Sequence, residues 1–316
     1  MLNIINSKKS GIYEKEISTE YSVKLDKLKE GEKITLASDI MFSTMFCNES
    51  RIKYSAKLLS YFLKDLSYEK ILNSIQIVNQ ELDKKYAIEK ANRVDYIAKM
   101  EDDYLMIEMN NNHNFYIMDR NISYMDRVYS KGVERGTTIT KDTYHYCIQL
   151  NLNNFSFVGN EKTYDIFYLQ NEEGELLTPK KIFIQIYIPN VMKKCYNGDK
   201  LTDLEKYLYT LFEKDVDKSL VVGGDDIVMK DYVKEAVEAS EKEEVIDFYD
   251  KEWELWDGGL TEGRRKGYEE GMNEGLAKGK TESKKETALA LLKKGVEIGI
   301  ISECTGLTIK QIEDLK

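Results

Sequence analysis

Two carboxylates and an amide occur at strand spacing in the stretch RVDYIAKMEDDYLMIEMNNN, residues 93–112. Asp95 belongs to a run in which side chains alternate in character, and this period of two predicts a β-strand. After a polar turn at 101–103, Glu108 and Asn110 share one face of a second strand, because successive side chains of a strand point to opposite sides. An antiparallel hairpin of this length brings Asp95 beside Glu108, with Asn110 one pleat further along.

Side chains of these types have the chemistry of a divalent-cation site. Carboxylate and amide oxygens are hard ligands, and a cation held beside a water molecule promotes hydrolysis. The same pattern also occurs on solvated sheet faces, where acidic residues on both arms of a hairpin are common. The hairpin alone leaves both interpretations open.

A stripe of basic and aromatic residues follows the hairpin. The expected helix over 115–131 repeats them at spacings of three and four, so they lie along one side of the helix. The members of the stripe are Tyr116, Arg120, Tyr124, Arg127 and Lys131. They predict either a phosphate-facing surface beside the acidic hairpin or a solvated amphipathic face with half-buried tyrosine rings.

Composition narrows the class of protein. The chain has 316 residues, of which 42% are hydrophobic, so it can bury a sizeable core. No apolar run reaches the roughly 20 residues of a membrane span, and the N-terminus has no continuous apolar segment of the secretory type. We therefore expect a cytoplasmic protein without a membrane partner.

Charge and metal-binding residue types narrow the function. The four cysteines are far apart in sequence and there are only two histidines, which argues against a disulfide framework, a zinc site or a histidine-based triad. The net charge of −10 argues against a broadly basic surface for nucleic acid, although a local one is compatible with it.

The elements that must position the hairpin are expected on both sides of it. A surface helix over 14–29 is followed by a helix that begins at Ser38 or Asp39 and by a second helix over 50–64. Further strands are expected over 71–81, 144–157, 164–169 and 181–188. Pro189 ends the last of these, and helices dominate from 201 onward. A mixed sheet flanked by helices, an α/β core, is the predicted fold.

We expect the chain to divide into five segments. They are a loosely held polar arm (1–35), an α/β core (36–200), a helical segment packing on the core (201–258), a glycine-periodic charged helix or linker (259–285) and a small helical segment (286–316).

Glycines recur at every fourth position of the tail. They are Gly263, Gly267, Gly271, Gly275 and Gly279. Each glycine costs a helix roughly 1 kcal/mol relative to alanine. Close approach of another helix, in a homodimer or against the body of the protein, would compensate. A low-complexity linker that is only partly helical is the alternative.

The last segment has the pattern helix, Thr-Gly-Leu, helix, which is typical of a helix-turn-helix. Its final helix carries Glu313 and Asp314, and an acidic helix is a poor reader of DNA. This favours a role in packing or oligomerisation.

In the order of these elements the sequence resembles the recombination-promoting nucleases of the PD-(D/E)XK superfamily, a group often labelled transposases. The resemblance runs from about Ser38 to the C-terminus. It is carried by SDIMFSTMF, the D…ExN hairpin, the helix with Arg120 and Tyr124, the strand ending near Pro189, LTDLEKYLY, the glycine-periodic tail and ISECTGLTIKQIEDL. It implies a restriction-endonuclease-like core and Mg²⁺-dependent (or Mn²⁺-dependent) hydrolysis of DNA phosphodiesters by a recombination-type or mobile-element endonuclease.

The resemblance also assigns roles to residues. The acid of the family falls on Asp95, and its ExQ or ExK element falls on Glu108 and Asn110. Asp95, Glu108 and the Met109 backbone carbonyl are then expected to hold the ion. Arg120, together with Arg127, is expected to hold a neighbouring phosphate, and Tyr124 and Lys131 share that stripe.

Departures from the family pattern predict weakened cleavage. Val94 replaces the signature proline, which affects only backbone shape. Asn110 stands where the superfamily has lysine and this family usually has glutamine, and Ser43 stands where relatives often carry lysine. Lys99, on the predicted face of Asp95, is a candidate replacement for the lost charge. A catalytically degenerate protein that binds DNA or assembles is the alternative function.

Overall fold

The computed structural model describes residues 15–78, 95–111, 116–130, 138, 140 and 143–315. The chain forms two compact units, of which the first covers Met1–Trp253 and the second Glu254–Lys316.

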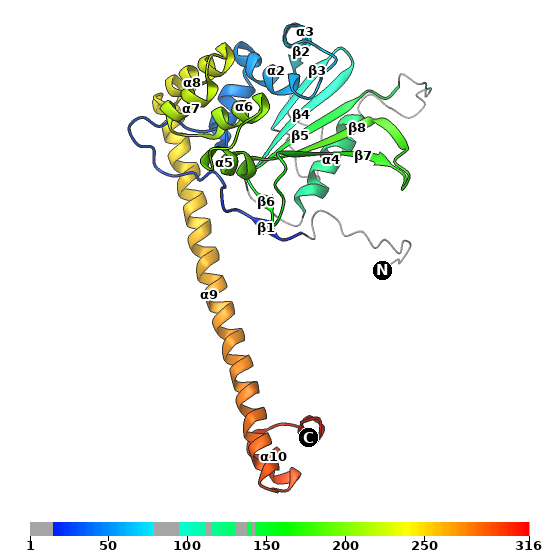
Figure 1. Ribbon diagram of the computed structural model, residues 1–316, viewed down its shortest axis with the longest axis vertical. Coiled ribbons are helices and arrows are strands. Elements are labelled where there is room, and N and C mark those ends of the chain that lie inside the picture. The colour runs from blue at the N-terminus through cyan, green and yellow to red at the C-terminus, as the bar shows by residue number, and fades with distance from the viewer. Residues whose placement is uncertain are drawn as a thin grey trace, which may run out of the picture. The chain divides into compact units, whose positions relative to one another are not determined.

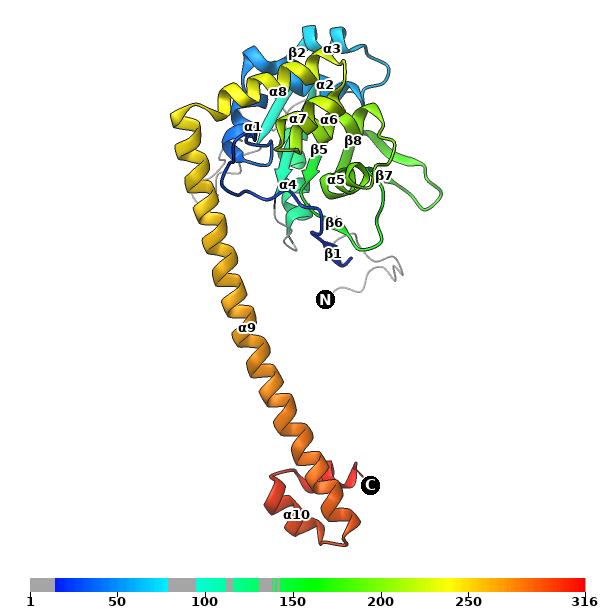
Figure 2. The ribbon, with the colours of Figure 1, turned by 60° about the vertical axis from the view of Figure 1, so that its left-hand side comes forward.

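A six-stranded mixed sheet forms the centre of the first unit (Figure 1). Its strands are β2 (Ile75–Ile77), β3 (Tyr96–Met100), β4 (Asp103–Asn110), β5 (Cys147–Asn153), β7 (Tyr164–Gln170) and β8 (Leu176–Tyr187), in the spatial order β2-β3-β4-β5-β8-β7. The three central strands β4, β5 and β8 run parallel, and the outer strands pair antiparallel to their neighbours. Figure 2 shows β7 at one border of the sheet, where it forms a hairpin with β8.

β3 and β4 form the hairpin that the sequence predicts. Tyr96 pairs with Ile107 and Met100 pairs with Asp103, so the turn falls at the expected polar residues. Glu101 has a left-handed φ of 56°, which reverses the chain in the short connection. This register aligns the residue that precedes β3, Asp95, with Glu108.

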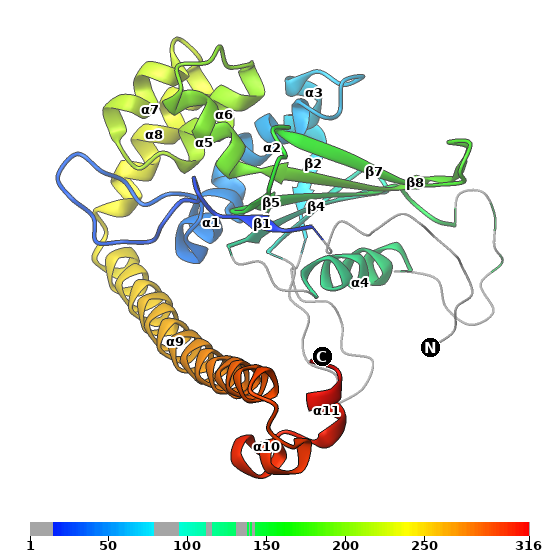
Figure 3. The ribbon, with the colours of Figure 1, turned by 60° about the horizontal axis from the view of Figure 1, so that its bottom comes forward.

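Helices cover both faces of the sheet (Figure 3). On one face Tyr96, Ile107 and Leu150 belong to the main hydrophobic core, to which α1, α2, α6 and α8 also contribute. On the opposite face Ile97 and Met106 pack in a separate cluster with residues of α4. Alternate residues of β3 and β4 therefore pack in two different hydrophobic clusters, one on each face of the sheet. This confirms the predicted α/β fold, a mixed sheet flanked by helices.

The helices of the first unit have the following bounds. They are α1 (Asp39–Phe46), η2 (Glu49–Arg51), α2 (Ile52–Ser60), α3 (Tyr68–Ser74), α4 (Ile117–Tyr129), α5 (Ile188–Tyr196), α6 (Asp203–Phe212), α7 (Val216–Gly223) and α8 (Ile227–Ser240), followed by the start of α9 (Glu243–Lys293). β8 ends where expected, since Pro189 occupies the first turn of α5.

The N-terminal helix expected over 14–29 is wrong for the described residues. The chain there is mostly extended, and β1 (Ile17–Ser18) pairs with β6 (Ser156–Phe157). Asn154 explains the difference, because its side chain accepts a hydrogen bond from Val23 N–H and donates one to Val23 O, both at 2.7 Å. Leu25 is also buried, so this part of the arm is held against the core by partners distant in sequence.

The strand expected over 71–81 is partly wrong. Residues 71–74 complete helix α3, and only Ile75–Ile77 form a strand, while 79–81 lie outside the described residues. Ser67 caps α3 by accepting a hydrogen bond from Lys70 N–H at 3.2 Å. This cap starts a helix just before the apolar run.

The second unit contains the remainder of α9 and two short helices, α10 (Ile298–Thr305) and α11 (Ile309–Glu313). Ala288, Ile301, Leu307 and Ile312 form its small core. As expected, Gly306 ends α10 with a φ of 69°, and Thr308 caps α11 in a reciprocal pair with Gln311. No helix in the described part of the chain has both the length and the apolar character needed to cross a membrane.

Candidate active site

Asp95 and Glu108 lie side by side, as the hairpin predicts. The backbone N–H of Asp95 donates to Glu108 Oε1 at 2.9 Å, and the backbone N–H of Met109 donates to Asp95 Oδ2 at 2.9 Å. Each carboxylate is therefore fixed by the backbone of the opposite arm. These backbone-to-carboxylate bonds extend the contact between the two arms one residue beyond the last pair of the β3–β4 ladder and hold the two acidic groups next to each other.

The Met109 carbonyl faces the same side of β4. In a β-ladder the N–H and C=O of one residue point toward the same neighbouring strand. Since Met109 N–H reaches Asp95, its carbonyl points to that side as well, whereas the Asn110 carbonyl points to the other side and accepts from Asn154 N–H at 2.9 Å. The backbone oxygen that we expected to join the site therefore has a suitable direction.

Glu108 is a buried carboxylate, only 2% exposed. Burial raises the pKa of Glu108 well above its ordinary value, and the neighbouring Asp95 carboxylate raises it further. The hydrogen bond from Asp95 N–H and the charge of Arg120 act in the opposite direction. The pocket around Glu108 thus disfavours negative charge unless a cation joins it.

Arg120 is the described cation nearest to this carboxylate. Its Nη2 lies 4.0 Å from Glu108 Oε2 and donates to Asn110 Oδ1 at 2.9 Å. The side chain of Arg120 is 43% exposed, so it connects the buried Glu108 carboxylate to solvent. Its guanidinium also lies over the ring of Tyr124, 5.7 Å from the centroid.

Asn110 begins a row of buried amides beneath α4. Its Nδ2 donates to Asn153 Oδ1, and Asn153 Nδ2 donates in turn to Gln185 Oε1, each at 2.9 Å. The three side chains stand on β4, β5 and β8 and are at most 4% exposed. Both ends of the Asn110 amide are therefore bonded within the protein, to Arg120 on one side and to Asn153 on the other.

The remaining residues of the stripe have different surroundings in the structure. Tyr124 is 6% exposed and packs in the core under α4. Arg127 lines a different depression, together with Asp119 and Asp126. Lys131 lies outside the described residues. Of the stripe, the structure brings Arg120 and Tyr124 to the acidic pair.

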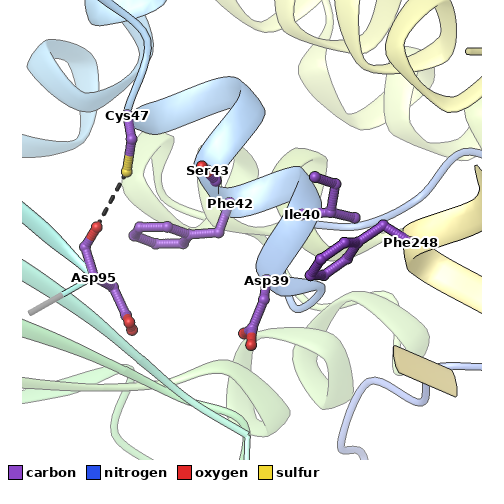
Figure 4. A pocket seen from close by; sticks show the side chains of 7 residues that line it. All are labelled: Asp39, Ile40, Phe42, Ser43, Cys47, Asp95 and Phe248. Atoms are coloured by element: carbon purple, nitrogen blue, oxygen red, sulfur yellow. Dashed lines mark hydrogen bonds between the residues drawn. The ribbon is translucent and has the colours of Figure 1, made fainter. Parts of the chain in front are cut away.

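A cavity of about 380 Å³ opens beside Asp95 (Figure 4). It is lined by Asp39, Ile40, Phe42, Ser43, Cys47, Asp95 and Phe248. The Asp39 carboxylate from the first turn of α1 points into the cavity that the Asp95 side chain also enters. The S–H of Cys47 donates to the Asp95 backbone carbonyl at 3.1 Å and ties the end of α1 to the start of β3.

The structure shows where Ser43 and Lys99 lie relative to Asp95. Ser43 lines the cavity, so a lysine at this position would place its charge near Asp95. Lys99 does not compensate, because its Nζ pairs with Asp102 at 3.2 Å in the hairpin turn. The expectation for Lys99 is wrong because four residues of strand carry it to the opposite end of the hairpin.

The donor set suits a hard divalent cation. Asp95 and Glu108 supply two carboxylates, and the Met109 carbonyl faces their side, which matches the oxygen ligands that Mg²⁺ and Mn²⁺ prefer. Within the described ranges no group of three or more His, Cys, Asp or Glu side chains is arranged as a complete metal cluster. A cation here would therefore rely on few protein ligands and keep several waters, as Mg²⁺ commonly does.

Asp39 lines the cavity next to Asp95, but the sequence predicted it only as the start of a helix and not as a functional residue. Its position after Ser38 indicates only the start of a helix. An acid in the first turn of a helix has an ordinary explanation, the favourable interaction with the helix dipole. The only further signal is its place in the opening SDIMFSTMF.

Comparison with known proteins places the chain in a family. The model of the PD-(D/E)XK nuclease family transposases matches residues 36–258, which is more than half of the chain. No curated protein matches the chain, and no solved structure matches it. The matched range includes the sheet, the acidic pair, α4 and the root of α9. This chain is a member of the PD-(D/E)XK nuclease family transposases.

Proposed function

We propose that the protein is a Mg²⁺-dependent (or Mn²⁺-dependent) DNA endonuclease of the recombination-promoting type. The observation that carries the proposal is the Glu108 carboxylate, buried against Asp95 and fixed by its backbone N–H. A buried carboxylate held against a second acidic group is unfavourable unless it is protonated or joined by a cation. Membership in a nuclease family supports a divalent metal ion as this cation and DNA as the substrate.

Asp95, Glu108 and the Met109 carbonyl would hold the ion. When bound, a divalent cation lowers the pKa of a water molecule and offsets the charge that builds on the scissile phosphate. The protein contributes a rigid position for these oxygens, because each carboxylate accepts a hydrogen bond from the partner strand. Asp39 adds negative charge to the wall of the adjoining cavity.

Arg120 would bind a phosphate next to the scissile one. Its guanidinium is exposed on one side and held by Asn110 and Tyr124 on the other. Such a fork donates two parallel hydrogen bonds to a phosphate. Arg120 also supplies the positive charge that Asn110 and Ser43 lack.

Asn110 would act through Arg120. Its Oδ1 accepts from Arg120 and its Nδ2 donates to Asn153, so the amide fixes the guanidinium beside Glu108. Tyr124 supports the same guanidinium from beneath. We assign Arg127 and Lys131 to DNA contacts further along the stripe.

Plasmid nicking by the purified full-length protein tests this function. We expect nicking that requires Mg²⁺ or Mn²⁺ and that Asp95→Ala abolishes. Asp102→Ala is the matched control, because Asp102 is an exposed acid in the turn of the same hairpin. Equal nicking by the wild type and Asp95→Ala would assign the cutting to another site or to a contaminant.

A catalytically degenerate protein that binds DNA or assembles is the second candidate. It is favoured by the engagement of both ends of the Asn110 amide and by Ser43 at the cavity wall. Titration calorimetry with Mn²⁺ separates the two functions. The endonuclease requires heat of binding that disappears in Asp95→Ala, whereas the degenerate protein shows none in either form.

The cytoplasm is the compartment that we propose for this activity. All four cysteines are described and they form no disulfide. Reduced thiols of this kind are usual for a protein that meets DNA in a reducing environment.

A further inference from the structure

The first turns of α9 form part of the candidate site. Val245 and Tyr249 on this segment are buried in the main core, and Tyr249 Oη donates to the Asp26 carbonyl at 2.8 Å. Phe248, which is 50% exposed, lines the cavity beside Ile40 (Figure 4). The root of α9 is therefore anchored to the first unit and presents side chains to the cavity that Asp95 lines.

Glu252 of this segment binds the beginning of α1. Its Oε1 accepts from Asp39 N–H at 2.9 Å, and its Oε2 accepts from Ser38 Oγ at 2.7 Å. Glu252 lies one helical turn after Phe248, so both side chains project from the same side of α9. A single carboxylate thus holds the two residues at which α1 starts.

This arrangement departs from ordinary helix capping. Ser38 is the N-cap of α1, yet its own side chain makes no capping hydrogen bond. A carboxylate 213 residues away in sequence accepts from the Asp39 N–H instead. Negative charge at a helix N-terminus is favourable, but local residues normally provide it. Because the cap comes from α9, the direction of the first turn of α1 depends on where α9 is anchored.

We propose that Glu252 is a positioning residue for the active site. By fixing Ser38 and the backbone of Asp39, it directs the Asp39 carboxylate into the cavity next to Asp95. Asp39 there attracts the cation and orders its water shell without needing direct contact. The inference rests on the proposed metal-dependent function, and it adds a C-terminal helix to the elements that build the site.

The alternative is that Glu252 only stabilises α1 as a helix cap. Variants that change its hydrogen bonds distinguish this role from positioning of the active site. Glu252→Ala removes both acceptors. Glu252→Gln keeps the side chain length, because its carbonyl can accept from Asp39 N–H while its amide donates to Ser38 Oγ. Ser38→Asp combined with Glu252→Ala restores a local cap and helix stability without restoring the link to α9. Asp250→Ala is the matched control, an exposed acid on the same turn of α9.

Mn²⁺ affinity of the full-length protein, measured by calorimetry without DNA, is the readout, with thermal unfolding recorded in parallel. We expect Glu252→Ala to weaken Mn²⁺ binding about tenfold, as is usual when a residue supporting a metal site is lost. The Ser38→Asp/Glu252→Ala double variant should regain thermal stability but not Mn²⁺ affinity. Glu252→Gln and Asp250→Ala should bind Mn²⁺ like the wild type.

Three results would overturn the inference while the proposed function stands. The first is wild-type Mn²⁺ affinity in Glu252→Ala. The second is recovery of affinity together with stability in the double variant, which would make Glu252 an ordinary cap. The third is an equal loss of affinity in Glu252→Gln and Glu252→Ala, since charge rather than hydrogen bonding would then be responsible. A wild-type protein that binds no Mn²⁺ would remove the proposed function and this inference together.

Discussion

The family resemblance leads us to expect a longer or charged side chain at position 110, and the surroundings of Asn110 explain how a short amide is accommodated there. The side chain is 2% exposed and bonds Arg120 and Asn153 at the same time. A lysine at this position would bring a second positive charge against Arg120. In this chain the positive charge closest to Glu108 among the described residues comes from α4, through Arg120.

Asn110→Ala tests the contacts of this amide with Arg120 and Asn153. The substitution leaves Asn153 Oδ1 without its donor and Arg120 without its acceptor, so we expect a loss of about 1–3 kcal/mol in the free energy of unfolding. Cleavage should fall in parallel, because Arg120 loses its fixed position. Urea denaturation and plasmid nicking measure the two effects. Asn171→Ala, which removes hydrogen bonds in an exposed turn, is the control; it should leave nicking unchanged and lower the free energy of unfolding by less than Asn110→Ala.

Lys33 gives a pH dependence to folding. It is fully buried, and its Nζ donates to the carbonyls of Thr210 and Glu213 at 3.1 and 2.6 Å. Burial lowers the pKa of Lys33 to about 7, with partial opposition from the Glu213 charge. Between about pH 7 and the ordinary lysine pKa of about 10.4, the unfolded chain therefore binds a proton that the folded protein does not.

The free energy of unfolding should consequently rise with pH over this interval, by at most about 1.4 kcal/mol per pH unit from Lys33. Chemical denaturation of the wild type and Lys33→Met at several pH values measures the contribution as a difference in slope. Parallel stability curves for the two proteins between pH 7 and 10 would mean that Lys33 is charged in the folded state.

At the scale of elements, the beginning of α6 combines a capping box with a partly buried ion pair. Glu205 Oε2 accepts from Thr202 N–H at 2.8 Å, and Oε1 accepts from Lys194 Nζ at 2.6 Å and from Thr163 Oγ1. Burial would raise the pKa of Glu205, but these hydrogen bonds outweigh it and lower the pKa to about 2. The group therefore joins α6 to α5 and to the segment before β7.

This carboxylate stabilises the fold above the ordinary glutamate pKa of about 4.3, and the contribution is lost as the pH falls toward 2. We expect Glu205→Gln to lower the free energy of unfolding at pH 7 by about 2 kcal/mol, the size of hydrogen bonds to a charged group. The difference from the wild type should shrink in acid. Thermal unfolding at pH 7 and pH 3 provides the comparison, and a difference independent of pH would exclude the carboxylate as its source.

Sequence patterns predicted the elements whose information is local. The β3–β4 hairpin follows from alternation and a polar turn, so the pairing of Asp95 with Glu108 was accessible without coordinates. The position of Asp39 near Asp95 could not be predicted in this way, because α1 and β3 come together only through tertiary packing. The helix over 71–74 was missed because a short apolar run fits a strand or a buried helix equally well. Only the Ser67 cap distinguishes them.

At the scale of the whole molecule, the glycines of α9 still need an explanation. A Cβ built at Gly263, Gly267, Gly271, Gly275 or Gly279 meets nothing within 4 Å among the described residues. The close approach of another helix to this stripe, in a homodimer or against the body of the protein, stays a proposal.

Alanine at positions 267, 271 and 275 tests the stripe. In a helix exposed to solvent, each substitution should add roughly 1 kcal/mol of helix stability. We expect higher helical content by circular dichroism and no change in sedimentation. Loss of a dimer in the same variant would instead assign the glycines to a contact between two copies, where a methyl group would separate the helices.

The buried amides between β4 and β8 have one more property. Arginine has no hydrogen-bond acceptor, so Asn110 must turn its oxygen toward Arg120, and Asn153 and Gln185 must follow in the same sense. The guanidinium thus imposes a single polarity at one end of a relay that spans three strands, and the Asn151 carbonyl, which accepts from Asn153 Nδ2 at 3.3 Å, imposes the same polarity in the middle. Glutamine at position 120, able to donate or accept, would remove only the first of these, so the relay should keep its direction. The side-chain NH₂ resonances of the row should then remain a single set.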